Sequence, residues 1–480
     1  MTSRLEAEIV GWLSAASERT IDTACAHVFL QPDRALKLKR HEDLGYADFS
    51  TVERRLWALD RELAFNAPSA PDIYRAVRRI TREADGSLAL EGAGALVDHV
   101  LEMRRFDETQ VLSACPEVVD GAMAEQLGRT IAGVHHAAPL RPGAGLTALE
   151  FTVGSNAQLL RETCQGLDQS RVEVMVALTA EELERQTPLL VRRSASGFSR
   201  RCHGDLHLGN ILLEDGRPIL FDCIEFNDVL SDLDVQYDLA FLLMDLDFRG
   251  RRDAAVRALS AYLDEAARVW PETLWEGLAA LPLMLAVRAG VRAHVSAHSG
   301  DPVTARAYVE AAISHLAPVA PVLAVVGGLS GSGKSTFARD LAPRLGAAPG
   351  AVILRTDEVR KRRLNVPPTD PIGAEHYTPD ALDRTYSAMF AEARALLAAG
   401  RAVVLDASFL EPAHRQRAEA LAREVGVSFQ AAWMEAPAAL LEARIAARID
   451  DASDATSAVL QDQLRRELGP IDWPKVSTVR

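Results

Sequence analysis

Cysteine is scarce in this sequence, with five residues among 480. Cys25, Cys115, Cys164, Cys202 and Cys223 are scattered, and their spacing matches neither a zinc site nor a disulfide scaffold. So few thiols in so long a chain are typical of a reducing compartment. We therefore interpret Cys202 and Cys223 as small buried apolar residues rather than as redox groups.

Targeting and membrane-spanning segments are also missing from the pattern. The first residues include Glu6 and Glu8 and lack the basic-then-apolar layout of a signal peptide. Charge-free stretches such as residues 317–333 are rich in glycine and shorter than the roughly 20 apolar residues of a membrane span. We expect a cytoplasmic protein with no membrane partner.

An excess of negative charge is confined to one part of the chain. Residues 317–480 hold 20 basic and 20 acidic residues, so the formal net charge of −14 belongs to residues 1–316. An acidic first part disfavours broad binding of nucleic acid or membranes there and is compatible with cationic substrates. The length of 480 residues predicts roughly three packing units of about 150 residues each.

The most informative stretch of the sequence reads His203-Gly-Asp-Leu-His-Leu-Gly-Asn210, and Phe221-Asp222 follows it. Asp205 and Asn210 have the spacing of the protein-kinase catalytic loop, in which the aspartate meets the substrate hydroxyl and the asparagine holds magnesium. Asp222 stands where that scheme needs a second metal ligand. We therefore predict that Asp205 is catalytic and that Asn210 and Asp222 bind a metal ion.

The residues between these ligands predict a β-hairpin. Residues 211–213 and 218–221 are apolar runs joined by the turn 214–217. Such a hairpin brings Asn210 and Asp222 to neighbouring strand ends. Oxygen ligands that converge on one hard cation are what magnesium requires.

The wording Cys-His-Gly-Asp-Leu-His-Leu-Gly-Asn-Ile-Leu, followed by Phe-Asp-Cys-Ile-Glu-Phe, resembles the aminoglycoside phosphotransferase family. That family writes His-Gly-Asp where protein kinases write His-Arg-Asp. The resemblance implies a bilobal protein-kinase-like fold that is mixed α/β and α+β. It also implies ATP (or GTP) and Mg2+ as cofactors, and small-molecule hydroxyl compounds as substrates.

A kinase of this type needs a strand lysine for the nucleotide phosphates. Residues 26–30 and 35–39 predict a hairpin whose alternation puts Lys37 and Lys39 on one face. Lys37 matches the family's strand lysine, and Lys39 stays the alternative. No G-x-G-x-x-G precedes this strand, so we assign no phosphate contact to residues 20–30.

A glutamate must hold that lysine in position. The helix predicted at residues 51–65 offers Glu62, and Glu53 is the alternative on the same helix. Farther along the chain, Glu225 and Asp232 follow the predicted metal ligand Asp222, and either could face a substrate.

The resemblance extends over nearly the whole chain to one bacterial branch of the family. In its members a phosphotransferase-like domain is joined to a P-loop kinase. The implied domains are residues 1–316, with an N-lobe at about 1–100 and a C-lobe at about 108–316, and residues 317–480, expected to be a parallel sheet flanked by helices.

The second part contains a phosphate-binding loop. Residues 322–326 predict an apolar strand, and Gly328-Leu-Ser-Gly-Ser-Gly-Lys-Ser335 follows it and opens a helix. In such a loop backbone N–H groups wrap the phosphates, the lysine reaches the β/γ oxygens, and the final serine binds magnesium. The nucleotide-binding residues predicted here are Gly328, Ser330, Gly331, Ser332, Gly333, Lys334, Ser335 and Thr336.

Two more predicted strands, residues 351–354 and 402–405, deliver Asp357 and Asp406 to the carboxyl edge of the sheet, where ligands bind in such folds. Asp357 can accept a hydroxyl proton, and Arg360 on the following helix can bind a substrate anion. Asp406 has the Walker-B position and is a predicted magnesium partner.

This arrangement resembles small-molecule P-loop kinases of the gluconate kinase and chloramphenicol phosphotransferase types, and also polynucleotide 5′-hydroxyl kinases. Arg444 and Arg448, four apart on a predicted helix, match the lid arginines of those kinases; a solvated basic face is the alternative. A locally basic cluster could meet nucleic acid or an anionic metabolite, although few aromatic residues accompany it. It consists of Arg355, Arg360, Lys361, Arg362 and Arg363.

The sequence therefore predicts a bifunctional ATP-dependent kinase with two heads, each of which moves a γ-phosphoryl group to a hydroxyl. Two alternatives stay open: the P-loop half is a polynucleotide 5′-hydroxyl kinase, or the first domain is a nucleotide-binding regulator. A protein kinase is disfavoured, because no activation-loop wording follows Asp222.

Overall fold

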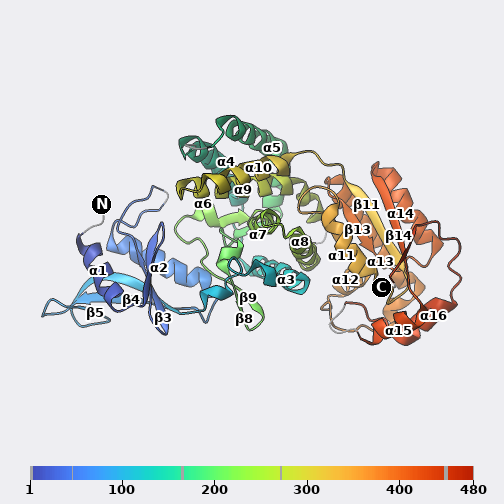
Figure 1. The fold of residues 1–480 in the computed structure, drawn as a ribbon, viewed down its shortest axis with the longest axis horizontal. Coiled ribbons are helices and arrows are strands. Elements are labelled where there is room, and N and C mark those ends of the chain that lie inside the picture. Colours follow the sequence, from blue (N-terminus) through green and yellow to red (C-terminus); the bar gives the residue numbers. More distant parts are fainter. Residues whose placement is uncertain (1–3, 46, 164–166, 271–272, 448–451, 479–480) are drawn as a thin grey trace. The chain divides into compact units, whose positions relative to one another are not determined.

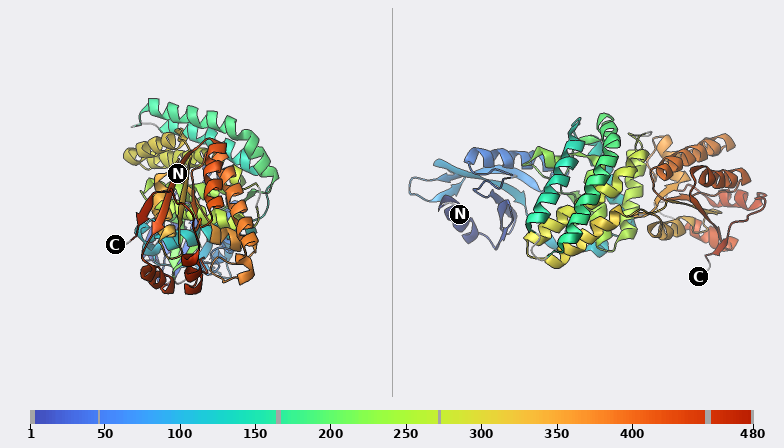
Figure 2. Two further views of the ribbon diagram at one scale, coloured as in Figure 1. Left: turned by 90° about the vertical axis from the view of Figure 1, so that its right-hand side faces the viewer. Right: turned by 90° about the horizontal axis from the view of Figure 1, so that it is seen from above.

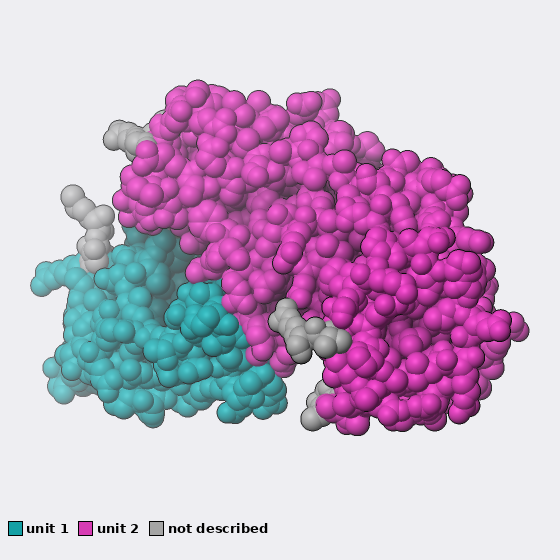
Figure 3. Space-filling view, turned by 45° about the vertical axis from the view of Figure 1, so that its right-hand side comes forward, with its two compact units in different colours: residues 1–118, 200–233 teal, residues 119–199, 234–480 magenta. Residues whose placement is uncertain are grey.

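The structure is a computed structural model that describes residues 4–45, 47–163, 167–270, 273–447 and 452–478. The chain divides into two compact units: residues 1–118 with 200–233, and residues 119–199 with 234–480 (Figure 3). The domain boundary predicted at residues 316/317 lies inside the second unit.

A six-stranded antiparallel sheet in the order β1-β2-β3-β6-β4-β5 forms the body of the first unit. Two helices accompany it, and Thr51 caps the second by accepting a hydrogen bond from the Arg54 N–H. The strands are β1 (Arg19–Asp22), β2 (Ala26–Leu30), β3 (Arg34–Lys39), β4 (Tyr74–Arg82), β5 (Leu88–Leu90) and β6 (Ala95–Arg104), and the helices are α1 (Arg4–Ala15) and α2 (Val52–Asn66).

Alternation along β3 separates the core from the site. Leu36 and Leu38 are fully buried and pack in one cluster with Ile9 and Phe29. Lys37 and Lys39 alternate with these leucines and point to the opposite face, where both contact Glu62 of α2. The hairpin of β2 and β3 is as predicted. Helix α1 ends at Ala15, because the β-branched pair that follows Arg19 joins the sheet as an edge strand.

The predicted catalytic hairpin is confirmed. β8 (Ile211–Glu214) pairs with β9 (Arg217–Leu220), and positive φ at Asp215 and Gly216 closes the two-residue turn. The short helix η3 (Leu208–Asn210) precedes it, and the Phe221 N–H donates to the Asn210 carbonyl over 3.1 Å. The remaining short elements are η1 (Glu108–Gln110), η2 (Pro116–Val118), β7 (Ser199–Arg201), α6 (Asp228–Ser231) and β10 (Asp232–Asp234).

Helices form the first part of the second unit. α7 is buried along almost its whole length, and α3 packs along α8. The helices are α3 (Gly121–Ala137), α4 (Ala144–Thr163), α5 (Gln169–Ala195), α7 (Val235–Phe248), α8 (Arg252–Ala266), η4 (Trp275–Ala280), α9 (Leu281–His298) and α10 (Pro302–Leu316).

One helical stretch of the described residues, Glu276–His298, is long and apolar enough to cross a membrane. In the structure 67% of its most apolar window is buried, and α9 packs against α4, α7 and α10. Burial among these helices accounts for its apolar composition, as in the core helices of soluble proteins.

The rest of the second unit is a five-stranded parallel sheet in the order β12-β13-β11-β14-β15 (Figures 1 and 2). All residues of β13, and all of β11 except its first residue Val322, are buried, so helices cover both faces. The strands are β11 (Val322–Gly328), β12 (Val352–Arg355), β13 (Val403–Asp406), β14 (Ser428–Glu435) and β15 (Lys475–Ser477).

The helices around this sheet place loops at its carboxyl edge. α11 directly follows the glycine-rich loop, and α12 directly follows β12. They are α11 (Lys334–Leu341), η5 (Ala342–Arg344), α12 (Thr356–Arg363), η6 (Ala374–Tyr377), α13 (Pro379–Ala398), α14 (Pro412–Val425), α15 (Ala438–Ala446) and α16 (Ser457–Arg465). Chain segments that are far apart in sequence therefore meet at one edge, as expected for an open parallel sheet.

Candidate active sites

A network of two lysines and three carboxylates lies in the first unit. The Lys37 ammonium contacts Glu62 at 2.6 Å and Asp222 at 2.8 Å. The Lys39 ammonium contacts the other oxygen of Glu62 at 2.7 Å and Glu225 at 2.5 Å. Glu62 is fully buried and joins both lysines, so it fixes the position of each.

The charges in this network are mutually dependent. Burial by itself would raise the pKa of Glu62, but the attraction of Lys37 and Lys39 outweighs it and lowers that pKa to about 2. Burial likewise opposes the charge of Lys37, yet Asp222 and Glu62 raise its pKa well above the ordinary value. The strand lysine is therefore held as an ammonium ion, the form that binds phosphate oxygens.

The sequence left Glu53 and Lys39 as alternatives to Glu62 and Lys37, and the structure shows what each of them contacts. Glu53 is exposed, and its own backbone N–H and the Thr51 hydroxyl lower its pKa, as befits the first turn of α2. The Lys39 side chain is 1% exposed, against 12% for Lys37. In the described part of the chain, Lys37 is the one of the two lysines that forms an ion pair with Asp222. Lys37 with Glu62 thus stays our prediction for the nucleotide-binding pair.

Hydrogen bonds within the predicted catalytic loop, residues 203–210, hold it in shape. The Asn210 amide donates to both the backbone carbonyl and the carboxylate of Asp205, each over 2.9 Å. His203 contacts the Phe221 carbonyl through Nε2 at 2.8 Å. The Asp205 side chain is 37% exposed, so it is oriented by the loop and still open to a substrate.

Asp222 has a strained backbone. Its φ is +62°, a conformation that costs a non-glycine residue about 1–3 kcal/mol. The Tyr74 hydroxyl accepts a hydrogen bond from its N–H over 2.9 Å, and Lys37 holds its carboxylate. Strain of this kind concentrates at functional sites, and the side chain is 46% exposed.

These residues fit a magnesium ion by their donor chemistry. Asn210 uses its amide nitrogen on Asp205, so the amide oxygen is its ligand atom, and Asp222 offers an exposed carboxylate. Both are hard oxygen ligands and both end the same hairpin. Their assignment to a metal stays a prediction.

Glu225 and Asp232, which the sequence left as possible substrate contacts, have partners within the protein instead. Glu225 is buried and bonded to Lys39 rather than turned to a substrate, because an ammonium buried on β3 needs a second counter-ion. Asp232 accepts from Arg201, which also reaches Asp228. The hydroxyl of Tyr74 under Asp222 had no signal in the sequence, since it comes from a separate strand.

In the second unit the loop between β11 and α11 depends on its glycines. Gly328, Gly331 and Gly333 have φ of +140°, +81° and +86°. A Cβ on Gly331 would lie 2.6 Å from the Leu441 carbonyl oxygen, and one on Gly328 would lie 2.6 Å from that of Met434. Only glycine allows this path, which is the cradle that an anion-binding loop requires.

Side chains of the loop are held from within and from α16. Lys334 donates to the Leu329 carbonyl over 2.8 Å. Gln463 accepts from the Ser330 N–H over 2.8 Å and donates to its hydroxyl over 3.0 Å. Ser332 is buried and Thr336 is exposed at the start of α11.

Arg355 at the end of β12 is a residue that sequence reasoning placed only in the basic cluster. Its guanidinium contacts the Asp406 carboxylate through Nε at 3.2 Å and the Ser335 hydroxyl through Nη2 at 3.4 Å. β12 and β13 pair in parallel with Arg355 opposite Asp406, which explains the contact. The two predicted magnesium partners therefore lie on either side of one arginine.

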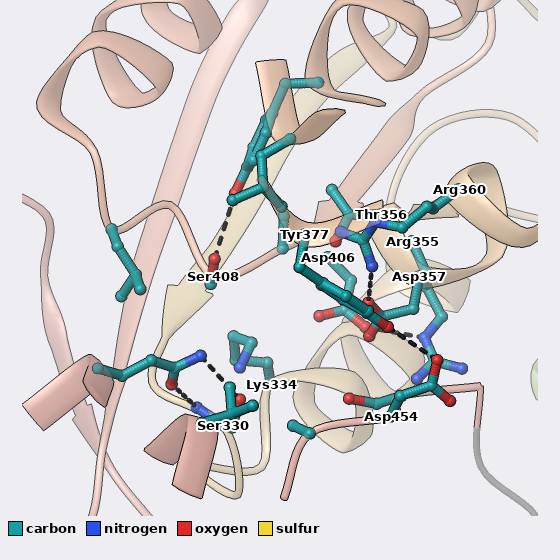
Figure 4. A pocket seen from close by; sticks show the side chains of 18 of the residues that line it. Ser330, Lys334, Arg355, Thr356, Asp357, Arg360, Tyr377, Asp406, Ser408 and Asp454 are labelled. Carbon is teal, nitrogen blue, oxygen red and sulfur yellow. Dashed lines mark hydrogen bonds and ion pairs between the residues drawn. The ribbon is translucent and has the colours of Figure 1, made fainter. Parts of the chain in front are cut away.

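A cavity of about 330 Å³ opens beside the loop and is lined by Lys334, Asp357, Ser408 and Asp454, among others (Figure 4). Arg360 pairs with the Asp357 carboxylate at 2.8 Å instead of standing free for a substrate anion.

Two aromatic residues of this cavity had no sequence signal. Arg360 lies 4.5 Å from the ring centre of Tyr377, whose hydroxyl donates to Asp454 over 2.8 Å. Burial raises the pKa of Tyr377 and raises that of Tyr386 to about 12, so both stay protonated at neutral pH. The cavity thus offers an aspartate, an arginine and two phenols to a polar acceptor.

The basic cluster is not an open patch. Four of its five members are buried and meet carboxylates: Arg355 with Asp406, Arg360 with Asp357, Lys361 with Asp454, and Arg362 with Asp264 and Glu392. Arg363 is exposed. Most of the positive charge of the cluster is paired with carboxylates inside the protein, which weakens the case for a nucleic-acid surface here.

The predicted lid arginines are only partly described. Arg444 on α15 donates to the Thr478 hydroxyl over 2.8 Å and carbonyl over 2.9 Å, and contacts the Gly331 carbonyl at 3.4 Å. It therefore adjoins the glycine-rich loop. Arg448 lies outside the described residues.

Comparison with known families decides what these sites belong to. Residues 58–275 match the phosphotransferase enzyme family, and residues 323–468 match an AAA domain. This chain joins a phosphotransferase-family domain to a P-loop kinase-like domain. Both matches support an ATP-dependent kinase with a mixed α/β, kinase-like fold followed by a P-loop domain.

Similar proteins extend along almost the whole chain. Uncharacterized proteins of Mycobacterium bovis and Mycobacterium tuberculosis are 29% identical over 473 residues, which cover 94% of this chain and 90% of theirs.

Solved structures align with parts of the chain. A gluconokinase from Sinorhizobium meliloti is 22% identical, covers 33% of this chain and 84% of its own, and has a TM-score of 0.24. A choline kinase from Cryptosporidium parvum is 11% identical, covers 65% and 94%, and has a TM-score of 0.39.

Proposed function

We propose that this protein is a phosphotransferase with two heads, each of which transfers the γ-phosphoryl group of ATP or GTP to a hydroxyl of a small molecule in the cytoplasm. The first head consists of Lys37, Glu62, Asp205, Asn210 and Asp222. The second head consists of the loop 328–336 with Asp357 and Asp406. The observation that supports the proposal is that, in each unit, the lysine predicted to bind phosphate lies near a partly exposed aspartate and near the oxygen atoms predicted to bind a cation.

In the first head, Lys37 holds the nucleotide phosphates, and Glu62 keeps the ammonium group from swinging away. Asp205, oriented by Asn210, accepts the proton of the acceptor hydroxyl while the hydroxyl oxygen attacks the γ-phosphorus. The bond from that phosphorus to the bridging oxygen breaks, and the nucleoside diphosphate leaves. Alignment of the reactants supplies much of the acceleration.

In the second head, backbone N–H groups of residues 328–335 and Lys334 hold the transferring phosphate. Asp357 accepts the hydroxyl proton of an acceptor bound in the cavity, and Arg360 orients that carboxylate through their ion pair. Arg444 supports the loop from its outer side. The acceptor must be small and polar, since the cavity has about 330 Å³ and is lined by charged and hydroxyl side chains.

Bound magnesium would supply positive charge against the negative charge that develops on the transferring phosphate. Asn210 and Asp222 would hold it in the first head, and Ser335 with Asp406 in the second. The chemistry of both donor sets is hydroxyl, amide and carboxylate oxygen, which suits this cation.

The test is a metabolite-extract screen with labelled ATP on the intact protein and on two variants, Asp205→Ala and Lys334→Ala. Two labelled products, each lost in one variant only, are the expected result. Binding of nucleotide with no labelled product would instead favour a regulator, and a labelled 5′ end on added RNA or DNA would favour the polynucleotide kinase.

A further inference from the structure

Helix α8 belongs to the core of the P-loop domain although it precedes that domain by more than fifty residues. Val256 packs in one buried cluster with Ala324, Ala338 and Ile353. The Ser260 hydroxyl accepts from the Ile353 N–H over 3.1 Å, which ties α8 to the edge strand β12. The end of β12 is where Arg355 stands, so α8 and its neighbour α3 adjoin the second head.

A chain of ion pairs, which we call the relay, runs from these helices to the second head. Asp264 on α8 contacts Arg129 on α3 at 3.1 Å, and Arg129 contacts Glu358 on α12 at 3.3 Å. Glu358 contacts Arg355 at 3.5 Å through the same oxygen atom that meets Arg129. The relay thus consists of Asp264, Arg129, Glu358 and Arg355.

The far end of the relay lies among the functional groups. Arg355 meets Ser335, which ends the glycine-rich loop, and Asp406 in the Walker-B position. One guanidinium cannot serve all three oxygen partners in arbitrary orientations, because its five N–H groups form a rigid planar fork. Whatever fixes Glu358 therefore also fixes how Arg355 presents itself to Ser335 and Asp406.

The near end of the relay is anchored. Arg362 donates to Asp264 over 2.5 Å and to Glu392 over 2.5 Å, so Asp264 stands between two arginines. Asp264 and Arg355 are 5% and 7% exposed, and the Glu358 side chain is 14% exposed. Charged groups with so little exposure depend on their ion-pair partners, and the loss of one group leaves its neighbour in the relay without a counter-ion.

We propose that Arg129 and Asp264 are positioning residues for the second head, acting through Glu358 on Arg355. The inference rests on the proposed function of that head. It makes the helices α3 and α8, which lie within the segment that matches the phosphotransferase family, part of the machinery of the P-loop domain. Phosphoryl transfer by the second head then depends on residues more than fifty positions before its own domain begins.

A plain structural role is the rival explanation: the relay only holds the helices against the sheet. A matched control separates the two. Arg268, just after α8, also contacts the P-loop domain, because it donates to the Val366 carbonyl over 3.0 Å. It pairs with Glu265 and with no member of the relay in the described ion pairs. Arg268→Gln therefore removes a cross-contact of the same kind without touching Arg355.

The experiment uses the full chain with Asp205→Ala as the parent, so that the first head is silent and nucleotide turnover belongs to the second. kcat, KM for the magnesium nucleotide and Tm are measured for Arg129→Gln, Glu358→Gln, their double variant and Arg268→Gln. We expect each relay variant to lower kcat by about tenfold, in the range seen when supporting partners of active-site ligands are removed. The double variant should be no slower than the slower single one, because both break the same chain.

Arg129→Lys guards against misfolding, since it keeps the charge and can reach one carboxylate. An intermediate kcat with an unchanged Tm supports positioning. A kcat in the relay variants equal to that of Arg268→Gln, or additive losses in the double variant, overturns the inference while the proposed function stands. If the parent shows no turnover that Lys334→Ala abolishes, the proposed function of this head fails first.

Discussion

The two heads hold their lysines in opposite ways. Lys37 is fixed by side-chain carboxylates from two separate segments, Glu62 on α2 and Asp222 after the catalytic hairpin. Lys334 donates to a carbonyl of its own loop, five residues earlier. The contacts of Lys37 form only when distant segments of the unit have folded together, whereas the contact of Lys334 lies within a single loop.

The difference extends to how each head tolerates change. In the first head the charges are interdependent, so the loss of Glu62 leaves buried ammonium groups with fewer partners. In the second head the shape of the site depends on the backbone path of the loop, which three glycines with positive φ allow. Side-chain substitutions should damage the first head most, and glycine substitutions the second.

The largest expected effect is that of Asp222→Asn. It keeps the shape and the tolerance of positive φ, since asparagine adopts that conformation readily. It removes one charge facing Lys37 and a predicted magnesium ligand, so kcat/KM of the first head should fall on the order of 1,000-fold, or several kcal/mol of barrier. Turnover of both labelled products is measured, and an equal loss in the second head would break the comparison.

Gly331→Ala tests the backbone path of the second head. Its Cβ would lie 2.6 Å from the Leu441 carbonyl, so the loop must shift, and nucleotide affinity of the second head should fall by about tenfold or more. Gly400→Ala is the matched control: φ is +75° there, but a Cβ would meet nothing within 4 Å. Calorimetric titration of magnesium nucleotide compares the two variants. Equal affinities would show that the loop does not carry binding.

Glu62→Gln should act on both stability and turnover of the first unit. It leaves Lys37 and Lys39 short of a shared counter-ion, a loss of about 3–5 kcal/mol for a broken buried pair. Glu53→Gln, on the exposed side of the same helix, should cost less than about 1 kcal/mol. Denaturant unfolding and KM for ATP are measured for both. Equal costs would sink the assignment of Glu62.

The smallest effect is the pH dependence that Glu62 confers. Its pKa is about 2 in the folded protein against an ordinary value of 4.5, so the native state binds fewer protons than the unfolded state between these values. The stabilisation is complete above pH 4.5 and is lost as pH falls toward 2. Between about pH 4.5 and about pH 2, the wild type should lose up to about 1.4 kcal/mol per pH unit more than Glu62→Gln.

Much of each site could be predicted because its residues are close in sequence. The spacing of Asp205 and Asn210, the hairpin that carries Asp222, and the loop with Lys334 are all local patterns, and the structure has the predicted strands and turns at these places. The roles of these residues stay predictions. The sequence did not show that Glu225 pairs with Lys39, or that most of the basic cluster at residues 355–363 is buried against carboxylates.

The sequence by itself determined the two motifs, their order along the chain and the elements that carry them, since turn chemistry, alternation and glycine placement act over a few residues. Only the tertiary structure decided that Glu62 serves two lysines, that Arg355 lies between Ser335 and Asp406, and that α8 packs into the P-loop domain. The physical reason is burial: a charge taken out of water must find its partner wherever the fold supplies one, and no local pattern records which distant residue that is.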